Sequence, residues 1–278
     1  MADQTGELKA QRISQIFRKA LHSRVKLGEV VRSLDITPES QCLTVSLSEV
    51  LLTHHLHMRD GKWSALAYGD DAVERFQDLL DGRIKGSKGV KMPYKDKTFD
   101  FVIVIDAFER VQDVASLIIE CHRVLRPTGR LVAIVPNAKS WSLVRSLQSG
   151  MGVNDQRRGW VRSGYTEQKL FHELKDGFDV FRMQSFSRFF VEFVDGIRLR
   201  LIESLGAREE DGDERVLRYY TVLYPLFWIG HQLDTLLFFT RGHYLIATAK
   251  RRAWLPRKTP VLSDGRSITE AVLSRIGD

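Results

Sequence analysis

The sequence has 278 residues, of which 43% are hydrophobic and 28% are charged, a composition typical of globular proteins. A chain of this length can bury a core that needs no disulfide or structural metal. Its two cysteines, Cys42 and Cys121, exclude a disulfide framework and a multi-cysteine zinc site. The formal net charge of +7 permits an acidic partner without identifying one.

The start of the chain and its apolar stretches indicate a cytoplasmic protein. Residues 1–9 are polar and no apolar segment follows them, so we expect no secretory signal. The longest uncharged span of the aromatic C-terminal region, 219–233, has 15 residues, whereas a membrane-spanning helix needs about 20 apolar residues. Peripheral attachment to a membrane surface stays open.

The first third of the chain alternates predicted helices and strands. A helix is predicted over 6–25, where apolar residues recur at helical spacing. Two strands, at 42–47 and 63–68, are each followed by a predicted helix, at 49–58 and 70–80. The second of these helices has an acidic start that suits the helix dipole.

The middle of the chain gives the clearest pattern. The run at 101–105 (FVIVI) is unbroken and apolar, as in strands that are buried on both faces of a parallel sheet. A helix at 114–125 ends at Pro127 and Gly129, and a second buried strand follows at 130–135. This strand–helix–strand order predicts right-handed βαβ units and an α/β fold with a doubly wound sheet.

The last third adds a helix that begins after Thr166, a strand at 179–186 and a last strand at 243–249. Between these strands, residues 193–242 read as mostly helical and form an insertion. Residues 219–229 within it are strongly aromatic. They predict either a lid helix packed on the sheet or a surface that meets lipid or a lipid-like substrate.

Four segments carry a family resemblance. Residues 92–100 read MPYKDKTFD, 106–111 read DAFERV, 123–130 read RVLRPTGR and 164–166 read GYT. In this order and spacing they resemble class I S-adenosylmethionine-dependent methyltransferases, in particular the type 11 group. The resemblance runs from about residue 42 to 188 and returns at the last strand.

The resemblance implies a Rossmann-like, mostly parallel seven-stranded sheet in the order 3-2-1-4-5-7-6. It also implies S-adenosylmethionine as cofactor, lying across the carboxyl ends of strands 1, 2 and 4. We expect four parts: an N-terminal helical extension (1–40), the methyltransferase-like core (41–192), a helical insertion or lid (193–242), and the last strand with a basic tail (243–278).

The cofactor positions that the resemblance implies are mostly degenerate here. They are Thr44, Ser46, Ser48, Val50, Asp70, Lys88 and Asp106. Three of them, Ser46, Ser48 and Val50, stand where the family has glycines. A β-branched residue cannot easily take positive φ, so we expect the backbone to turn directly from strand into helix. Lys88 stands where the resemblance implies an acidic or polar residue that accepts a hydrogen bond from the adenine amino group of the cofactor. A lysine has only donors, so this hydrogen bond cannot form.

No catalytic residue is identified. Asp106, Asp100 and Glu109 lie near the predicted switch point of the sheet and are candidates for a direct role, Asp106 first. The simpler interpretation is that Asp100 is a turn residue at the strand start and Glu109 a charge at a helix entry. His54, His55 and His57 lack further ligands at suitable spacing, so we expect no metal site there.

Two segments, 83–97 and 241–258, are rich in lysine and arginine. The usual interpretation is a charged surface in contact with water; the alternatives are that they bind an anionic membrane or an acidic partner. Nucleic acid is disfavoured because no recognised binding module is present.

Two functions remain open. In the first, the chain is an S-adenosylmethionine-dependent methyltransferase that acts on a small or lipid-like acceptor beneath the insertion. In the second, it is a catalytically inactive, methyltransferase-like binding or scaffold protein, with a protein partner or a membrane surface. The residues 44–50 discriminate between them, because the family's glycine-rich cradle would lie there.

Overall fold

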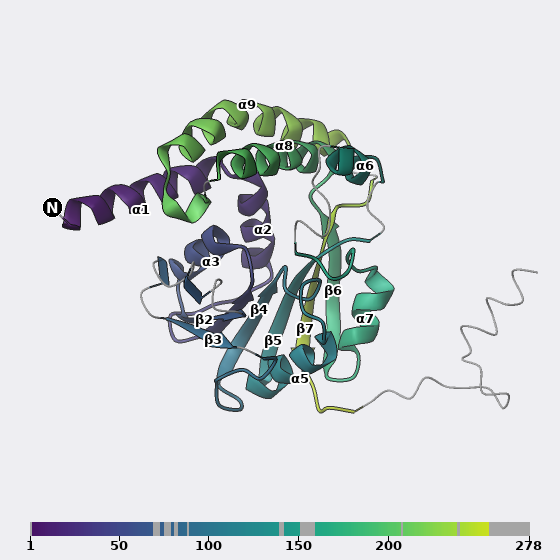
Figure 1. Ribbon diagram of the computed structural model, residues 1–278. Helices are drawn as coiled ribbons and strands as arrows, with labels where there is room; N and C mark the ends of the chain where they lie inside the picture. The colour runs from purple at the N-terminus through teal and green to yellow at the C-terminus, as the bar shows by residue number, and fades with distance from the viewer. Residues whose placement is uncertain are drawn as a thin grey trace, which may run out of the picture.

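The computed structural model describes residues 2–68, 73–74, 79–80, 83–87, 89–138, 142–150, 159–206, 208–237 and 240–255. Its centre is a seven-stranded sheet in the order β3-β2-β1-β4-β5-β7-β6 (Figure 1). The strands are β1 (Gln41–Ser46), β2 (Lys62–Tyr68), β3 (Ile84–Ser87), β4 (Phe99–Ile105), β5 (Leu125–Pro136), β6 (Phe178–Phe186) and β7 (Tyr244–Arg251).

The first five strands pair in parallel, and β7 runs antiparallel to both β5 and β6. This confirms the predicted doubly wound, mostly parallel sheet. In such a sheet the carboxyl ends of β1 and β4 lie side by side where the strand order reverses, and ligands of open α/β sheets bind there.

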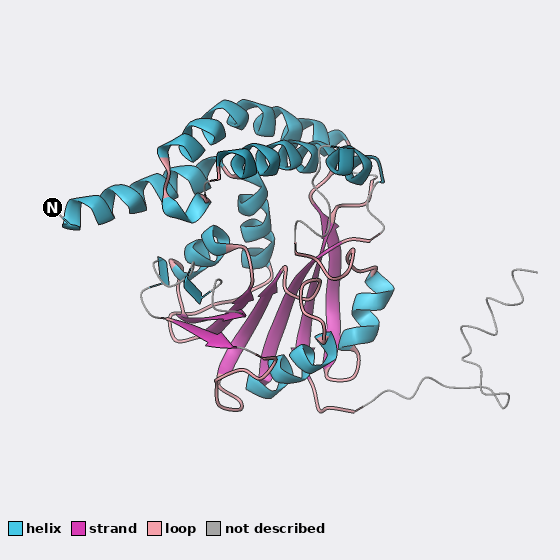
Figure 2. Cartoon of the chain, viewed as in Figure 1, coloured by secondary structure: helices cyan, strands magenta, loops and turns pink. Residues whose placement is uncertain are grey.

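Helices cover both faces of the sheet (Figure 2). They are α1 (Ala2–Lys19), α2 (Leu21–Arg32), α3 (Val50–His57), α5 (Val114–Val124), α6 (Ser142–Gly150), α7 (Glu167–Leu174), α8 (Phe189–Leu205) and α9 (Glu214–Leu236). A short 3-10 turn, Glu209–Asp211, joins α8 to α9. Across the described residues, no helix is both long and apolar enough to cross a membrane.

Successive side chains of β4 point to opposite faces of the sheet, so they belong to two different layers of the core. Phe101 and Ile103 face one layer, where they pack with residues of α1, α2, α3 and α9. Val102 and Val104 face the other layer, which holds residues of α5 and α7. Because every β4 residue from 101 to 105 is buried, the sheet is covered on both faces, as the apolar run predicts.

The N-terminal helix differs from the prediction over 6–25. The helix breaks at Ala20, whose ψ of 75° is not helical, and α2 then continues to Arg32. Apolar periodicity carries through the break because both helices bury one face, so the pattern does not reveal it. Ile16 of α1 and Val30 of α2 are both fully buried. The extension is therefore part of the core.

Two elements were missing from the sequence prediction. The strand β3 has four residues at the edge of the sheet, and none of them is fully buried, so it lacks an apolar signal. The helix α6 was also not predicted. By contrast, the predicted cap at Thr166 is confirmed, since its side chain accepts a hydrogen bond of 3.1 Å from the Lys169 amide.

The inserted helices α8 and α9 form a hairpin that lies over one end of the sheet together with α1 (Figure 1). The left-handed Gly206 ends α8, and the side chain of Asp213 caps α9. At the far end of the hairpin, the Asp234 carboxylate accepts hydrogen bonds from the amides of Phe190 and Val191, at 2.8 and 3.1 Å. These bonds tie the end of α9 to the start of α8.

Candidate functional site

The chain turns directly from β1 into α3. The Ser46 hydroxyl accepts a hydrogen bond of 3.2 Å from the Glu49 amide, and the Val50 amide donates to the Ser48 carbonyl at 3.1 Å. Val50 is the first residue of α3 and its side chain is buried, packed with Ala65. Among the described residues that are not glycine, positive φ occurs at Lys97, Asp106 and Ser187. The turn therefore makes no use of the conformations that glycine allows.

Thr44, the position of the family's first aspartate, lies inside the sheet. Its hydroxyl contacts His57 Nε2 at 3.0 Å and donates to the Ser64 carbonyl at 3.3 Å. It is fully buried and does not line the cavity described below. In this structure Thr44 links β1 to α3 and β2.

Asp106 stands at the carboxyl end of β4 in a left-handed conformation, with φ of 48°. Aspartate tolerates the left-handed region better than most residues do, and residues in this conformation are found mainly at turns and functional sites. Its amide donates to the Ile134 carbonyl at 3.2 Å, and the residue is only 4% exposed. The strained turn aims the carboxylate at the space above the ends of β1 and β4.

Lys26 of α2 fills the space between these strand ends. Its side chain is 1% exposed, and its ammonium group donates to Glu49 Oε1 at 2.7 Å and to Asp106 Oδ2. The same nitrogen lies 4.1 Å from the centre of the Tyr244 ring at the start of β7, a cation–π contact. One lysine thus joins the carboxyl ends of β1 and β4 to the amino end of β7.

The charges of this group are strongly coupled. Burial opposes the ammonium, yet Asp106 and Glu49 raise the pKa of Lys26 well above its usual value. Burial also opposes the Glu49 carboxylate, but Lys26 and His22 lower its pKa to about 2. Burial and the charge of Glu49 raise the pKa of Asp106. Lys26 and Glu49 are therefore both charged at neutral pH and form an ion pair.

A cavity of about 270 Å³ borders this ion pair. Its lining is largely polar and charged and includes Ser48, Glu49, Asp106, His22, Asp195 and Arg198. The strand ends supply the first three of these residues, α2 supplies His22, and α8 supplies the last two. The inserted hairpin therefore closes the site at the switch point. Pockets for cofactors and drug-sized ligands usually measure about 300–1,000 Å³, so this cavity is small.

Several residues singled out by the sequence lie elsewhere. Asp100 accepts from the Gln41 amide at 2.9 Å and from Arg126 at 2.7 Å, at the amino ends of β1 and β4. Glu109 is fully buried, and burial together with the charge of Asp106 raises its pKa well above the usual value. Asp70 and Lys88 lie outside the described residues.

The histidines of α3 do not form a cluster of ligands. The Nδ1 atoms of His54 and His55 contact the carbonyls of Leu79 and Leu51, at 3.0 and 2.9 Å, while His57 contacts the Thr44 hydroxyl. His55 stacks on Phe17 of α1 and His57 on Trp63 of β2. The three side chains thus tie α3 to its neighbours.

Four buried polar residues that meet between α2 and α8 were not predicted from the sequence. They are His22, Lys26, Glu192 and Asp195, all less than 6% exposed. His22 and Lys26 are one helical turn apart, as are Glu192 and Asp195. Polar residues on the buried face of an amphipathic helix are the one sequence signal that could have drawn attention to them.

Comparison with known proteins bears on the fold of this chain. A family model described as "Methyltransferase domain" matches residues 65–133. Demethylmenaquinone methyltransferase from Staphylococcus epidermidis is 22% identical over 139 residues, which cover 49% of this chain and 55% of that protein. The chain thus spans about half the length of the curated relatives it matches.

Solved structures match over a larger part of the chain. A putative sarcosine dimethylglycine methyltransferase from Galdieria sulphuraria has a TM-score of 0.53 at 15% identity and covers 85% of this chain and 86% of its own. Geranyl diphosphate C-methyltransferase from Streptomyces coelicolor has a TM-score of 0.51 at 10% identity, over 81% of this chain and 75% of its own.

The chain has the fold of class I S-adenosylmethionine-dependent methyltransferases, and its sequence is similar to that family over residues 65–133. The segments that carry the match lie between β2 and β5, where the sequence motifs also resemble the family. The turn after β1 lies outside the matched residues.

The residues at the switch point do not fit the cofactor that the family uses. The turn from Ser46 to Val50 lacks glycines, and Val50 is packed into the core. Lys26 holds a positive charge between the ends of β1 and β4, where the family's resemblance implies a cofactor that itself carries a cationic sulfonium. Lys26 already pairs with Glu49 and Asp106, so these carboxylates are not free to attract a second cation.

Proposed function

We propose that this chain is a methyltransferase-like binding or scaffold protein that does not take S-adenosylmethionine in the family's manner. The observation that supports the proposal best is the buried ammonium group of Lys26 between Glu49 and Asp106. It pairs with both carboxyl groups at the switch point from within the chain, and α2 holds it there as part of the core.

A cofactor bound in the family's manner would have to displace the Lys26 ammonium group from its two carboxyl partners. Removing one partner of a buried, hydrogen-bonded ion pair costs about 3–5 kcal/mol, because the other charge is left unpaired. Every 1.4 kcal/mol weakens binding tenfold, so moving Lys26 aside would weaken cofactor binding by more than about 100-fold. The packed turn at Val50 opposes the cofactor as well, since it offers no glycine backbone for close approach.

Isothermal titration with S-adenosylmethionine and S-adenosylhomocysteine tests the proposal directly. We expect no binding by the wild-type chain at concentrations up to about 1 mM. The Lys26→Ala variant removes the competing charge and leaves Glu49 and Asp106 in place. Lys169→Ala, on the opposite layer in α7, is a matched control that removes an equally charged side chain far from the site.

Micromolar binding by the wild-type chain would overturn the proposal. Binding gained by Lys26→Ala and not by Lys169→Ala would identify Lys26 as the group that excludes the cofactor. If neither variant binds, the turn at 46–50 is sufficient to exclude it. Circular dichroism and a cooperative melting transition check that each variant is folded.

A second function, methyl transfer to a lipid-like acceptor, is favoured by one feature of the hairpin. The outer face of α9 exposes Val222, Leu226, Trp228, Ile229, Leu233 and Leu236. Two of the similar proteins are named for isoprenoid substrates, a demethylmenaquinone and geranyl diphosphate. If the wild-type chain does bind S-adenosylhomocysteine, assays of methyl transfer to prenylated quinones become the next test.

The same exposed stripe supports a location at a membrane surface for the binding protein. Contiguous apolar side chains on one helix face are uncommon on free surfaces and mark sites of interaction. We propose that α9 lies in the interfacial layer of an anionic membrane and that a protein or lipid-like ligand is bound beneath it.

A further inference from the structure

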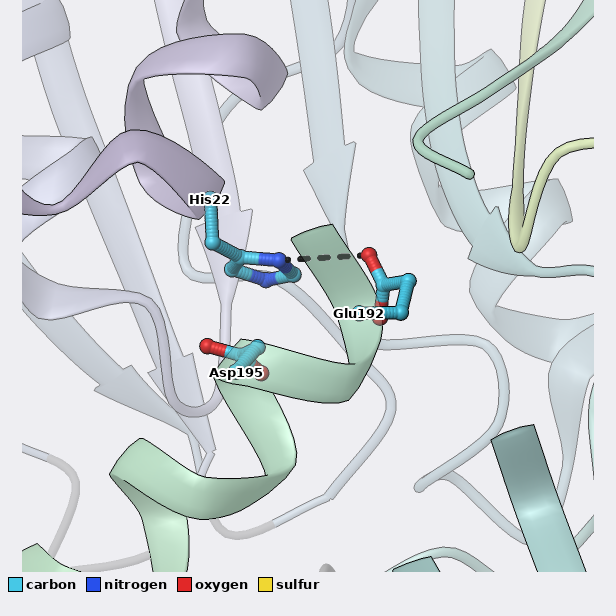
Figure 3. Close-up of side chains that lie close together, drawn as sticks. All are labelled: His22, Glu192 and Asp195. Carbon is cyan, nitrogen blue, oxygen red and sulfur yellow. Dashed lines mark ion pairs between the residues drawn. The ribbon is translucent and has the colours of Figure 1, made fainter. Parts of the chain in front are cut away.

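Three buried side chains with metal-ligating chemistry meet between α2 and α8. Figure 3 shows His22 pointing from α2 toward Glu192 and Asp195, which both come from α8. One ligand atom from each residue lies within 4.8 Å of the other two. The three residues are 5%, 3% and 2% exposed. The cluster is thus formed by elements far apart in the sequence and is closed to bulk water.

One imidazole nitrogen in this cluster lacks a hydrogen bond. Among the described residues, His22 Nδ1 is buried without a hydrogen-bond partner, although it lies 3.4 Å from Glu192 Oε1. Buried polar atoms are normally satisfied, so an orphaned nitrogen that faces two carboxylates indicates a missing partner. A metal ion is a partner that accepts a lone pair from nitrogen and from both carboxylates at once.

The charge balance points the same way. Arg198 donates to Asp195 Oδ1 at 2.6 Å and also pairs with Glu209, so one guanidinium serves two carboxylates. Glu192 accepts from the neutral hydroxyl of Ser187 and otherwise faces His22. The two buried carboxylates need a positive charge at His22, which a protonated imidazole supplies and which a divalent ion in place of that proton would supply more strongly.

We propose that His22, Glu192 and Asp195 bind one divalent transition-metal ion. The site joins α2 to α8 and opens onto the cavity at the switch point, which His22 and Asp195 also line. This inference does not rest on the proposed function, although His22 Nε2 lies 3.9 Å from Glu49 Oε1 and so connects the two groups.

The donor set and its spacing fit such an ion. In a tetrahedral site with bonds of about 2.0–2.2 Å, neighbouring ligand atoms are about 3.3–3.6 Å apart, close to the 3.4 Å between His22 and Glu192. A triangle with 4.8 Å sides has its centre about 2.8 Å from each corner, so small side-chain movements reach bonding distance. One imidazole with two carboxylates suits Mn²⁺ or Zn²⁺ better than Ca²⁺ or Mg²⁺. Three protein ligands leave a further position for water or a ligand.

The tests use the full chain and the metals alone. After treatment with a chelator, isothermal titration with Mn²⁺ and with Zn²⁺ is expected to give one site per chain. His22→Gln and Glu192→Gln should each weaken binding at least tenfold. Glu203→Gln, an exposed carboxylate on the same helix, and His172→Gln, an exposed histidine on α7, are matched controls that should leave binding unchanged.

A direct spectroscopic readout complements the variants. Electron spin-echo modulation of the Mn²⁺-loaded wild-type chain should show one coupled imidazole nitrogen, and this signal should disappear in His22→Gln. Absence of metal binding at about 100 µM, or binding without a coupled nitrogen, would overturn the proposal. So would equal losses in the site and control variants. If a site variant fails to fold, the nitrogen signal of the wild-type chain decides alone.

Discussion

His57 shows how a single buried side chain can make stability depend on pH. The imidazole is 7% exposed, and burial followed by the charge of Arg83 lowers its pKa to about 3. The folded chain therefore keeps it neutral, whereas the unfolded chain takes up a proton below the ordinary value of about 6.5. The stability from this group is fully present above pH 6.5 and is lost as the pH falls from 6.5 toward 3.

We expect this loss to amount to about 1.4 kcal/mol per pH unit below 6.5, or about 2 kcal/mol between pH 7 and 5. His57→Gln removes the titrating group and keeps a partner for Thr44, so its free energy of unfolding should fall less over this range. Urea denaturation at pH 7, 6 and 5 measures the difference. His172→Gln, at an exposed position, should retain the full wild-type dependence; an unchanged slope in His57→Gln would contradict the assignment.

At the scale of one element, α9 is apolar on both its buried face and its exposed face. Phe227 and Tyr220 are buried against the rest of the hairpin and α1, while Trp228, Ile229 and Leu226 are 56%, 48% and 48% exposed. A helix with an apolar outer face and an apolar inner face gains free energy by placing the outer one in a membrane interface. The helix is thus the element on which the membrane proposal depends.

We expect the wild-type chain to float with vesicles that contain anionic lipid and to shift its tryptophan emission toward the blue. Burial of one leucine or isoleucine is worth about 1.5–3 kcal/mol, so Ile229→Glu should weaken vesicle binding at least about tenfold. Phe181→Glu changes an exposed apolar residue on β6 and is the matched control. Failure of the wild-type chain to float, or equal losses in both variants, would refute the membrane placement.

At the scale of the whole molecule, the N-terminal helices are integral to the fold. Ile13, Ile16, Phe17, Leu27 and Val30 of α1 and α2 are buried in the same cluster as strands of the sheet. The extension also carries Lys26 and His22, which meet residues of β4 and α8. The N-terminal segment thus contributes both to the core and to the site.

Removal of residues 1–32 should therefore abolish cooperative unfolding or make the chain aggregate, because each large buried apolar side chain contributes about 1.5–3 kcal/mol. Removal of residues 1–8 leaves these side chains in place and should change the melting temperature by only a few degrees. Scanning calorimetry of both truncated chains distinguishes these outcomes. A shorter chain that melts as cooperatively as the wild type would show that the extension is dispensable.

Much of the fold was predictable because it depends on local patterns. The apolar run of β4, the end of α5 and the Thr166 cap are each read within one short window of sequence. The predicted start of the following strand at 130 is wrong, because β5 already begins at Leu125 and includes Pro127 and Gly129. The local patterns predict strands and helices in the right order, and the handedness of βαβ units then leaves few arrangements of the sheet. The short edge strand β3 could not be predicted in this way, because none of its four residues is fully buried and so they carry no apolar period.

The sequence by itself determined the doubly wound sheet, the resemblance to class I methyltransferases and the absence of glycines at 46–50, since each depends on neighbouring residues. The tertiary structure alone brought Lys26 to Glu49 and Asp106, which lie 23 and 80 positions away, and His22 to Glu192 of the inserted hairpin. Periodicity marks which face of a helix is buried, but not what that face meets. A lysine on α2 becomes informative only when folding removes it from water and leaves two carboxylates as its partners.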